Sequence, residues 1–131
     1  MLAKTVLKKM RARLPGAVEL VYDNYNALVV GFGPNERASD AIFSIALYPR
    51  WINLFFLYGA SLPDPHRILK GSGKQVRSLT INDAADLDKS EVRELMEAAL
   101  KNADPPIDPK QKRRMTIRAV SAKQRPRIPR S

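Results

Sequence analysis

The chain has 131 residues, a formal net charge of +10 and no cysteine. The length suits one domain with a single core, and the missing cysteines exclude disulfides, thiolate chemistry and cysteine-ligated metals. No apolar run reaches the roughly 20 residues that a membrane span needs. The N-terminal residues lack the apolar region of a secretory signal, so we expect a cytoplasmic protein.

The positive charge is concentrated in the last fifth of the chain. Residues 104–131 carry nine Lys or Arg and two Asp, a net charge of +7, whereas residues 1–103 carry a net charge of +3. We therefore predict one domain over residues 1–103 and a basic, flexible tail over residues 104–131. Such a tail attracts polyanions, and the alternative is a solvated tail that keeps the protein soluble.

Residues 2–14 form the first predicted helix, because their apolar side chains fall in one arc at 100° per residue. Pro15 and Gly16 then break the helix, and a second short helix is expected over residues 17–22. The opposite side of the first helix is a predicted basic surface, with one further cation outside it. The surface comprises Lys4, Lys8, Lys9 and Arg11, and the further cation is Arg13.

Strands follow along the middle of the chain. Residues 27–32 have β-branched residues at their centre. Residues 41–58 contain two apolar runs on either side of Pro49-Arg50, which is the pattern of a β-hairpin. Both faces of the first run are apolar, so it is expected in the middle of a sheet. Residues 76–81 alternate between two faces and form the fourth predicted strand.

A second amphipathic helix is predicted over residues 89–103, with Asp88 and Glu91 as its capping box. Residues 115–120 are a candidate edge strand beyond it. The expected fold class is α+β, a two-layer sandwich. Its antiparallel sheet would have four to five strands, with the N- and C-terminal helices on one face.

The sequences FFLYGASL and KGSGKQVRSLTIND carry a resemblance to a known family. Together with the order of predicted elements, they resemble the YdhG-like family of small bacterial domains over roughly residues 2–103. The resemblance implies a fold similar to frataxin and no agreed activity, and one branch of the family looks like an iron chaperone. Iron sites of that type use carboxylates, whereas the first helix here is cationic. We therefore expect no tight iron site, and iron handling stays an alternative.

A basic glycine turn is the strongest candidate for a binding site. Glycine permits positive φ and close backbone approach, so successive N–H groups can converge on an anion. The spacing differs from that of a Walker A loop. We predict an anion site here, the alternative being a plain turn with solvated lysines. The assigned residues are Lys70, Gly71, Ser72, Gly73, Lys74 and Arg77, together with Arg50 at the hairpin tip.

Two further groups of side chains are candidates for ligand or nucleic-acid contact. Tyr48, Trp51 and Tyr58 surround the hairpin and could stack on a base or ligand, although core or sheet-edge positions are the alternative. The tail cations could bind phosphate groups of nucleic acid. These cations are Lys110, Lys112, Arg113, Arg114 and Arg118.

No catalytic constellation is present in the sequence. His66 is the only histidine, the serines have no identifiable base, and the glutamates of the second helix suit a solvated face. We expect a non-enzymatic binding protein without cofactor or metal, whose partner is a small anionic ligand or a protein. Nucleic-acid binding through the tail is the second hypothesis and iron handling the third.

Overall fold

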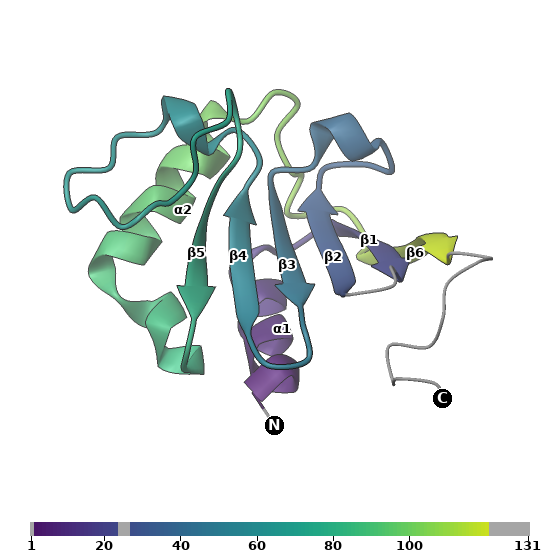
Figure 1. The fold of residues 1–131 in the computed structure, drawn as a ribbon. Coiled ribbons are helices and arrows are strands. Elements are labelled where there is room, and N and C mark those ends of the chain that lie inside the picture. Colours follow the sequence, from purple (N-terminus) through teal and green to yellow (C-terminus); the bar gives the residue numbers. More distant parts are fainter. Residues whose placement is uncertain (1, 24–26, 121–131) are drawn as a thin grey trace, which may run out of the picture.

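The structure, a computed structural model, describes residues 2–23 and 27–120. It has an α+β fold with two α-helices and an open, mostly antiparallel sheet of six strands in the order β5-β4-β3-β2-β1-β6 (Figure 1). Strands β1 and β6 are parallel. No helix within the described residues has the length and apolar character needed to cross a membrane. The elements in chain order are α1 (Leu2–Arg13), β1 (Val18–Asp23), β2 (Leu28–Gly33), η1 (Ala38–Asp40), β3 (Phe43–Leu47), β4 (Ile52–Phe56), η2 (Gly59–Ser61), β5 (Arg77–Ile81), η3 (Ala84–Asp88), α2 (Ser90–Asn102) and β6 (Arg114–Val120).

The buried core contains residues from both helices and from alternate positions of the central strands. Figure 1 shows both helices behind the sheet. Alternation on the strands follows from their two-residue period, which sends every second side chain to the same face. Phe43 and Phe56 meet edge to face with ring centroids 5.4 Å apart. Representative core residues are Met10 of α1, Leu54 of β4 and Met96 of α2.

The predicted hairpin is confirmed, and so is the α+β class. Strands β3 and β4 pair antiparallel, with Phe43 opposite Phe56 and Leu47 opposite Ile52. Strand β3 lies between β2 and β4, as the two apolar faces of its sequence indicated. The second long helix is also present as α2, one residue shorter than predicted at each end.

The short helix expected over residues 17–22 is wrong, because these residues form strand β1. Strand β1 pairs with β2 on one side and with β6 on the other. The sheet therefore has six strands, not four or five. The chain enters β1 through Gly16, whose φ is +82° and where a Cβ would lie 2.0 Å from the carbonyl oxygen of Asp108. Only glycine fits this turn.

Part of the predicted tail belongs to the sheet. Residues 114–120 form β6, which pairs with β1 so that Arg114 lies opposite Val18. The edge-strand alternative is thus the one that the structure shows for this segment. A domain boundary at residue 103 would divide this sheet, and residues 121–131 of the predicted tail lie outside the described residues.

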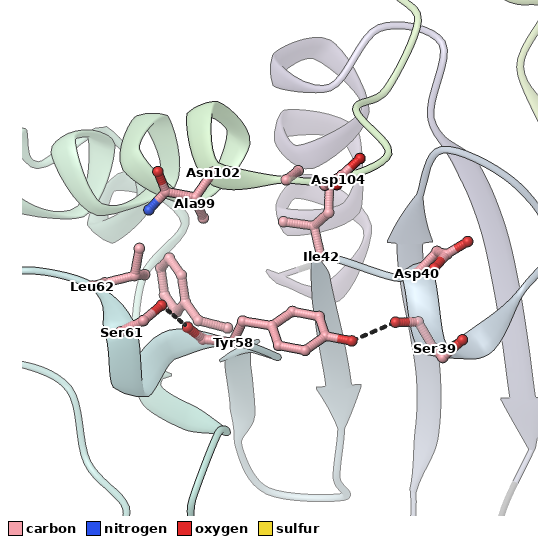
Figure 2. Close-up of a pocket in the computed structure, with 11 residues that line it drawn as sticks. Ser39, Asp40, Ile42, Tyr58, Ser61, Leu62, Ala99, Asn102 and Asp104 are labelled. Atoms are coloured by element: carbon pink, nitrogen blue, oxygen red, sulfur yellow. Dashed lines mark hydrogen bonds between the residues drawn. The ribbon is translucent and has the colours of Figure 1, made fainter.

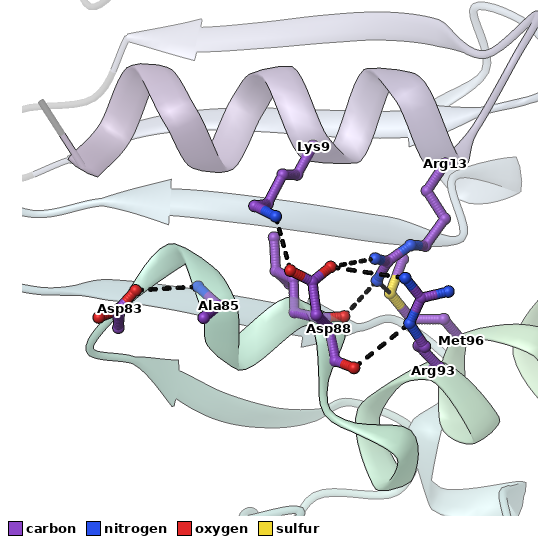
Figure 3. Close-up of polar contacts among 8 residues, drawn as sticks. Lys9, Arg13, Asp83, Ala85, Asp88, Arg93 and Met96 are labelled. Atoms are coloured by element: carbon purple, nitrogen blue, oxygen red, sulfur yellow. Dashed lines mark hydrogen bonds and ion pairs between the residues drawn. The ribbon is translucent and has the colours of Figure 1, made fainter.

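The expected capping box of the second helix is also wrong. Helix α2 begins at Ser90 after Lys89, whose side chain makes no capping bond. The capping box lies one element earlier, where Asp83 and Asp86 cap η3. Asp88 instead directs its carboxylate toward Lys9 and other cations (Figure 3).

Candidate functional site

The segment Lys70–Arg77, which we call the glycine–lysine turn, is held in one conformation by its own residues. Lys70 and Ser78 exchange two backbone hydrogen bonds of 2.7 and 2.9 Å. The guanidinium of Arg77 donates from Nη1 to the carbonyl oxygens of Gly73 and Val76, at 2.7 and 2.8 Å. The arginine that was expected to contact an anion therefore organises the turn as well.

Glycine is required at one position of this turn. Gly71 has φ +136°, a conformation that side chains rarely adopt, and a Cβ there would lie 3.0 Å from the carbonyl oxygen of Val76. At Gly73 an added Cβ would meet no atom within 4 Å. Gly71 thus sets the backbone path, and the space around Gly73 is open.

Donors on the exposed side of the turn have no partner within the described residues. This holds for the backbone N–H groups of residues 71–74 and for the ammonium groups of Lys70 and Lys74. Residues 62–78 carry four Lys or Arg and one acidic residue, whereas the rest of residues 1–103 carries equal numbers of each sign. This segment therefore contributes the whole net charge of residues 1–103.

A cavity of about 240 Å³ behind Lys70 has balanced charges. Lys70 and Lys89 line it together with Asp86 and Glu91, and Lys89 pairs with Asp86 at 3.3 Å. Burial would raise the pKa of Asp86, but hydrogen bonds from backbone N–H groups and from Lys89 outweigh it and lower that pKa. Asp86 is thus held as an anion, and this cavity does not favour an anionic ligand.

Arg50, the remaining residue of the predicted anion site, lies elsewhere. It is at the tip of the β3–β4 hairpin, two residues before Ile52, whereas the glycine–lysine turn ends at Arg77, which pairs with Phe56 at the other end of β4. The four residue steps of β4 separate its two ends by about 13 Å. The structure therefore does not bring Arg50 and the turn together.

The three candidate aromatic residues are also divided between the two ends of the sheet. Tyr48 and Trp51 stack beside the hairpin tip with ring centroids 4.9 Å apart. Tyr58 lies at the other end, where its hydroxyl donates to the backbone oxygen of Ser39 (Figure 2). Trp51 and Tyr58 are 49% and 47% exposed, so neither is a core residue.

The ring of Tyr58 forms one wall of a cavity of about 390 Å³. No local sequence pattern indicates this cavity, since its lining comes from η1, the adjoining ends of β3 and β4, η2 and the end of α2. Its polar residues, among them Asp40, Asn102 and Asp104, were not candidates. Only the folded arrangement brings these segments together.

Two cations that were expected to contact phosphate are paired with carboxylates of the fold. Arg113 donates to the carboxylate of Glu19 at 3.4 Å and to the backbone oxygen of Arg11 at 2.7 Å. Arg114 pairs with Glu36 at 3.0 Å. Three exposed tail cations have no ion pair within the described residues. These are Lys110, Lys112 and Arg118.

Half of the predicted basic surface of α1 is paired as well: Lys9 and Arg11 have carboxylate partners, whereas Lys4 and Lys8 have none within the described residues. Lys9 and Arg13 reach Asp88 at 2.6 and 2.9 Å, and Arg93 approaches the same carboxylate at 3.6 Å (Figure 3). The hydrogen bond from Lys9, followed by its charge and by Arg13, lowers the pKa of Asp88 against a smaller opposing effect of burial. These contacts attach α1 to η3.

Comparison with family models, with curated proteins and with solved structures finds no match to this chain. The YdhG-like resemblance thus stays a prediction.

Residues 2–23 and 27–120 contain no group of three or more His, Cys, Asp or Glu side chains placed to hold a metal. His66 lines a cavity of about 120 Å³ with Asp64, Glu91 and Glu94. Both oxygens of Asp64 accept backbone N–H groups of the following turn, at 3.0 and 2.9 Å. That carboxylate thus has a structural role.

Proposed function

We propose that the chain is a non-enzymatic binding protein that takes an anionic ligand at the glycine–lysine turn. The observation that carries this proposal is that the N–H groups of residues 71–74 and the ammonium groups of Lys70 and Lys74 have no partner within the described residues. Consecutive backbone donors in a turn with a positive φ form a concavity that suits an oxyanion. Arg77 supports the site by bonding to Gly73 and Val76.

Phosphate is the anion that best fits these donors. It offers several acceptor oxygens to converging N–H groups, and lysine binds it as a mobile point charge. A compound with two or more linked phosphates would span both lysines of the turn. Because the turn is exposed, the binding energy comes from many weak contacts and is sensitive to salt.

Three expectations from the sequence belong to the same proposal. The two helices cover one face of the sheet in a two-layer sandwich, which is supported by the shared core of Val6, Leu54 and Leu95. The protein acts in the cytoplasm, which suits a chain without cysteine. Its family is the YdhG-like one, for which the sequence of the turn is the main support.

Calorimetric titration with inorganic tripolyphosphate tests the proposal. The double variant Lys70→Gln/Lys74→Gln should bind about tenfold more weakly, since two exposed ion pairs contribute about 0.7 kcal/mol each. Lys4→Gln/Lys8→Gln is the matched control, because these two lysines of α1 are also exposed and unpaired within the described residues. The control should bind within twofold of the wild type. Equal loss in both variants would show that tripolyphosphate responds to total charge and that the turn is not a site.

A further inference from the structure

We propose that the cavity beside Tyr58 is a second binding site, which takes a small organic cation with an apolar body. Its volume of about 390 Å³ falls within the range of roughly 300–1,000 Å³ that small-molecule sites occupy. None of its lining residues belongs to the glycine–lysine turn. The two sites therefore take ligands of opposite charge and are independent.

The charge of the cavity favours a cation. Among the described residues, Asp40 and Asp104 line it and no lysine, arginine or histidine does. The carboxylate of Asp104 makes no hydrogen bond or ion pair within residues 2–23 and 27–120. Asp40 accepts a hydrogen bond from Asn35 at 3.0 Å and is 3.7 Å from Arg37, whose side chain is 77% exposed. A bound cation would thus meet one free carboxylate and one that is loosely paired.

The base of the cavity is apolar and buried. Ile42 is 6% exposed and Phe56 is fully buried, and both line the cavity with Leu62 and Ala99. Such a surface gains free energy when an alkyl or aryl group displaces water from it. A bare metal ion or a fully polar cation would leave this surface unused, so the ligand has an apolar body.

The arrangement of these groups orients the ligand. In Figure 2 Asp40 lies with Ser39 toward one end of the cavity, and Leu62 and Ser61 lie toward the other. Tyr58 extends between these ends, since its hydroxyl donates to the backbone oxygen of Ser39 and its own backbone oxygen accepts from Ser61. The positive group would lie at the carboxylate end, where the tyrosine ring adds a cation–π contact, and the apolar body would point toward Leu62.

Binding of 2-phenylethylammonium, followed by ¹H–¹⁵N NMR, tests this proposal. We expect the largest shifts at residues that line the cavity, and at least tenfold weaker binding of 3-phenylpropionate, which has a similar body and a negative head. Asp104→Asn should weaken binding of the ammonium probe about fivefold, as expected for a unit charge pair about 4 Å apart in a water-like dielectric. Glu97→Gln is the matched control, because Glu97 is exposed on α2 and does not line the cavity. It should change the affinity less than twofold.

A second variant separates occupation of the cavity from attraction by surface charge. Ala99→Leu places a larger side chain in the cavity and should abolish binding of the ammonium probe while tripolyphosphate binding at the turn is unchanged. Shifts scattered over other acidic residues would overturn the proposal. So would equal binding of the two probes, or an affinity that neither Asp104→Asn nor Ala99→Leu alters. Failure of tripolyphosphate to bind would contradict the proposed function alone.

Discussion

Arg11 and Glu19 form a two-pronged ion pair between α1 and β1. Arg11 Nε lies 2.8 Å from Glu19 Oε2, and Arg11 Nη2 lies 2.9 Å from Glu19 Oε1. Glu19 is only 1% exposed, so its charge depends on this pair and on Arg113. The hydrogen bond from Arg11 to Glu19 is also the main cause that raises the pKa of Arg11. One buried carboxylate thus ties the first helix to the first strand and to the segment before β6.

Glu19→Gln should lower the free energy of unfolding by about 2 kcal/mol. Breaking a buried ion pair costs roughly 3–5 kcal/mol, and we expect less because the side chain of Arg11 is 37% exposed. The corresponding fall in Tm is about 8 °C for a chain of this size. Chemical and thermal denaturation measure both quantities.

Glu36→Gln is the matched control for this prediction. It removes the partner of Arg114 in a pair whose side chains are 46% and 47% exposed, and such surface pairs contribute about 0–1 kcal/mol. Equal destabilisation by the two substitutions would mean that the burial of Glu19 adds nothing to its ion pair.

Asp88→Asn should remove a stabilising effect that depends on pH. In the wild type, the contacts of Asp88 with Lys9 and Arg13 hold the pKa of its carboxyl in the folded protein below the ordinary value of 3.8. The stabilisation is therefore complete above the unfolded pKa and is lost as the pH falls through the folded pKa. We expect wild type to have the higher Tm at pH 7 and the difference to shrink as the pH falls below 3.8. A difference that stays constant over this range would contradict the account, and Glu97→Gln serves as a control without such contacts.

Removal of residues 104–131 should lower the Tm by ten degrees or more. The sequence interpretation predicted a harmless truncation, but β6 pairs with β1. The side chain of Gln111 also donates to the carbonyl oxygens of Gly16 and Pro34 at 2.7 and 3.1 Å. A chain that ends at Val120 keeps these contacts and is the control. If the chain that lacks residues 104–131 melts within a few degrees of this control, the predicted boundary at residue 103 is correct.

The local elements of this fold could be predicted from sequence, because their signals lie within a few residues. The apolar runs around Pro49-Arg50 indicate β3 and β4, and the spacing of Val92, Leu95 and Met96 indicates α2. Strand β1 was mistaken for a helix because its six residues are too few to distinguish the helical period of about 3.6 residues from the two-residue period of a strand. Its assignment as a strand depends on pairing with β2 and β6, which no local pattern shows.

The candidate site was predictable only where it is local. The glycine–lysine turn is one continuous segment, and its sequence alone suggested an anion site. The cavity beside Tyr58 combines Asp40, Leu62 and Asp104 from three distant segments, so no spacing could indicate it. In the same way Asp88 was assigned to helix capping, because its contact with Lys9 spans 79 positions of the chain.

Nucleic-acid binding through the tail should be weak, sensitive to salt and indifferent to sequence. The triple variant Lys110→Gln/Lys112→Gln/Arg118→Gln removes the tail cations that are unpaired within residues 104–120 and keeps the ion pairs of Arg113 and Arg114. Each lost phosphate contact should reduce the salt slope of duplex binding by about 0.9. The remaining cations of the predicted tail lie outside the described residues; they are Lys123, Arg125, Arg127 and Arg130. A strong preference between two unrelated duplexes would contradict this prediction, because phosphate contacts do not specify bases.

The most direct measurement of the central claim is a ¹H–¹⁵N NMR titration of the full chain with inorganic tripolyphosphate. If the turn is an anion site, a bound oxyanion would accept hydrogen bonds from the N–H groups of residues 71–74. We therefore expect these amide signals to move first and farthest and to saturate, while the signals of Lys4, Lys8 and Arg50 change little. Shifts spread evenly over all exposed cations, or signals of residues 71–74 that stay in place, would contradict the claim that this turn is an anion site.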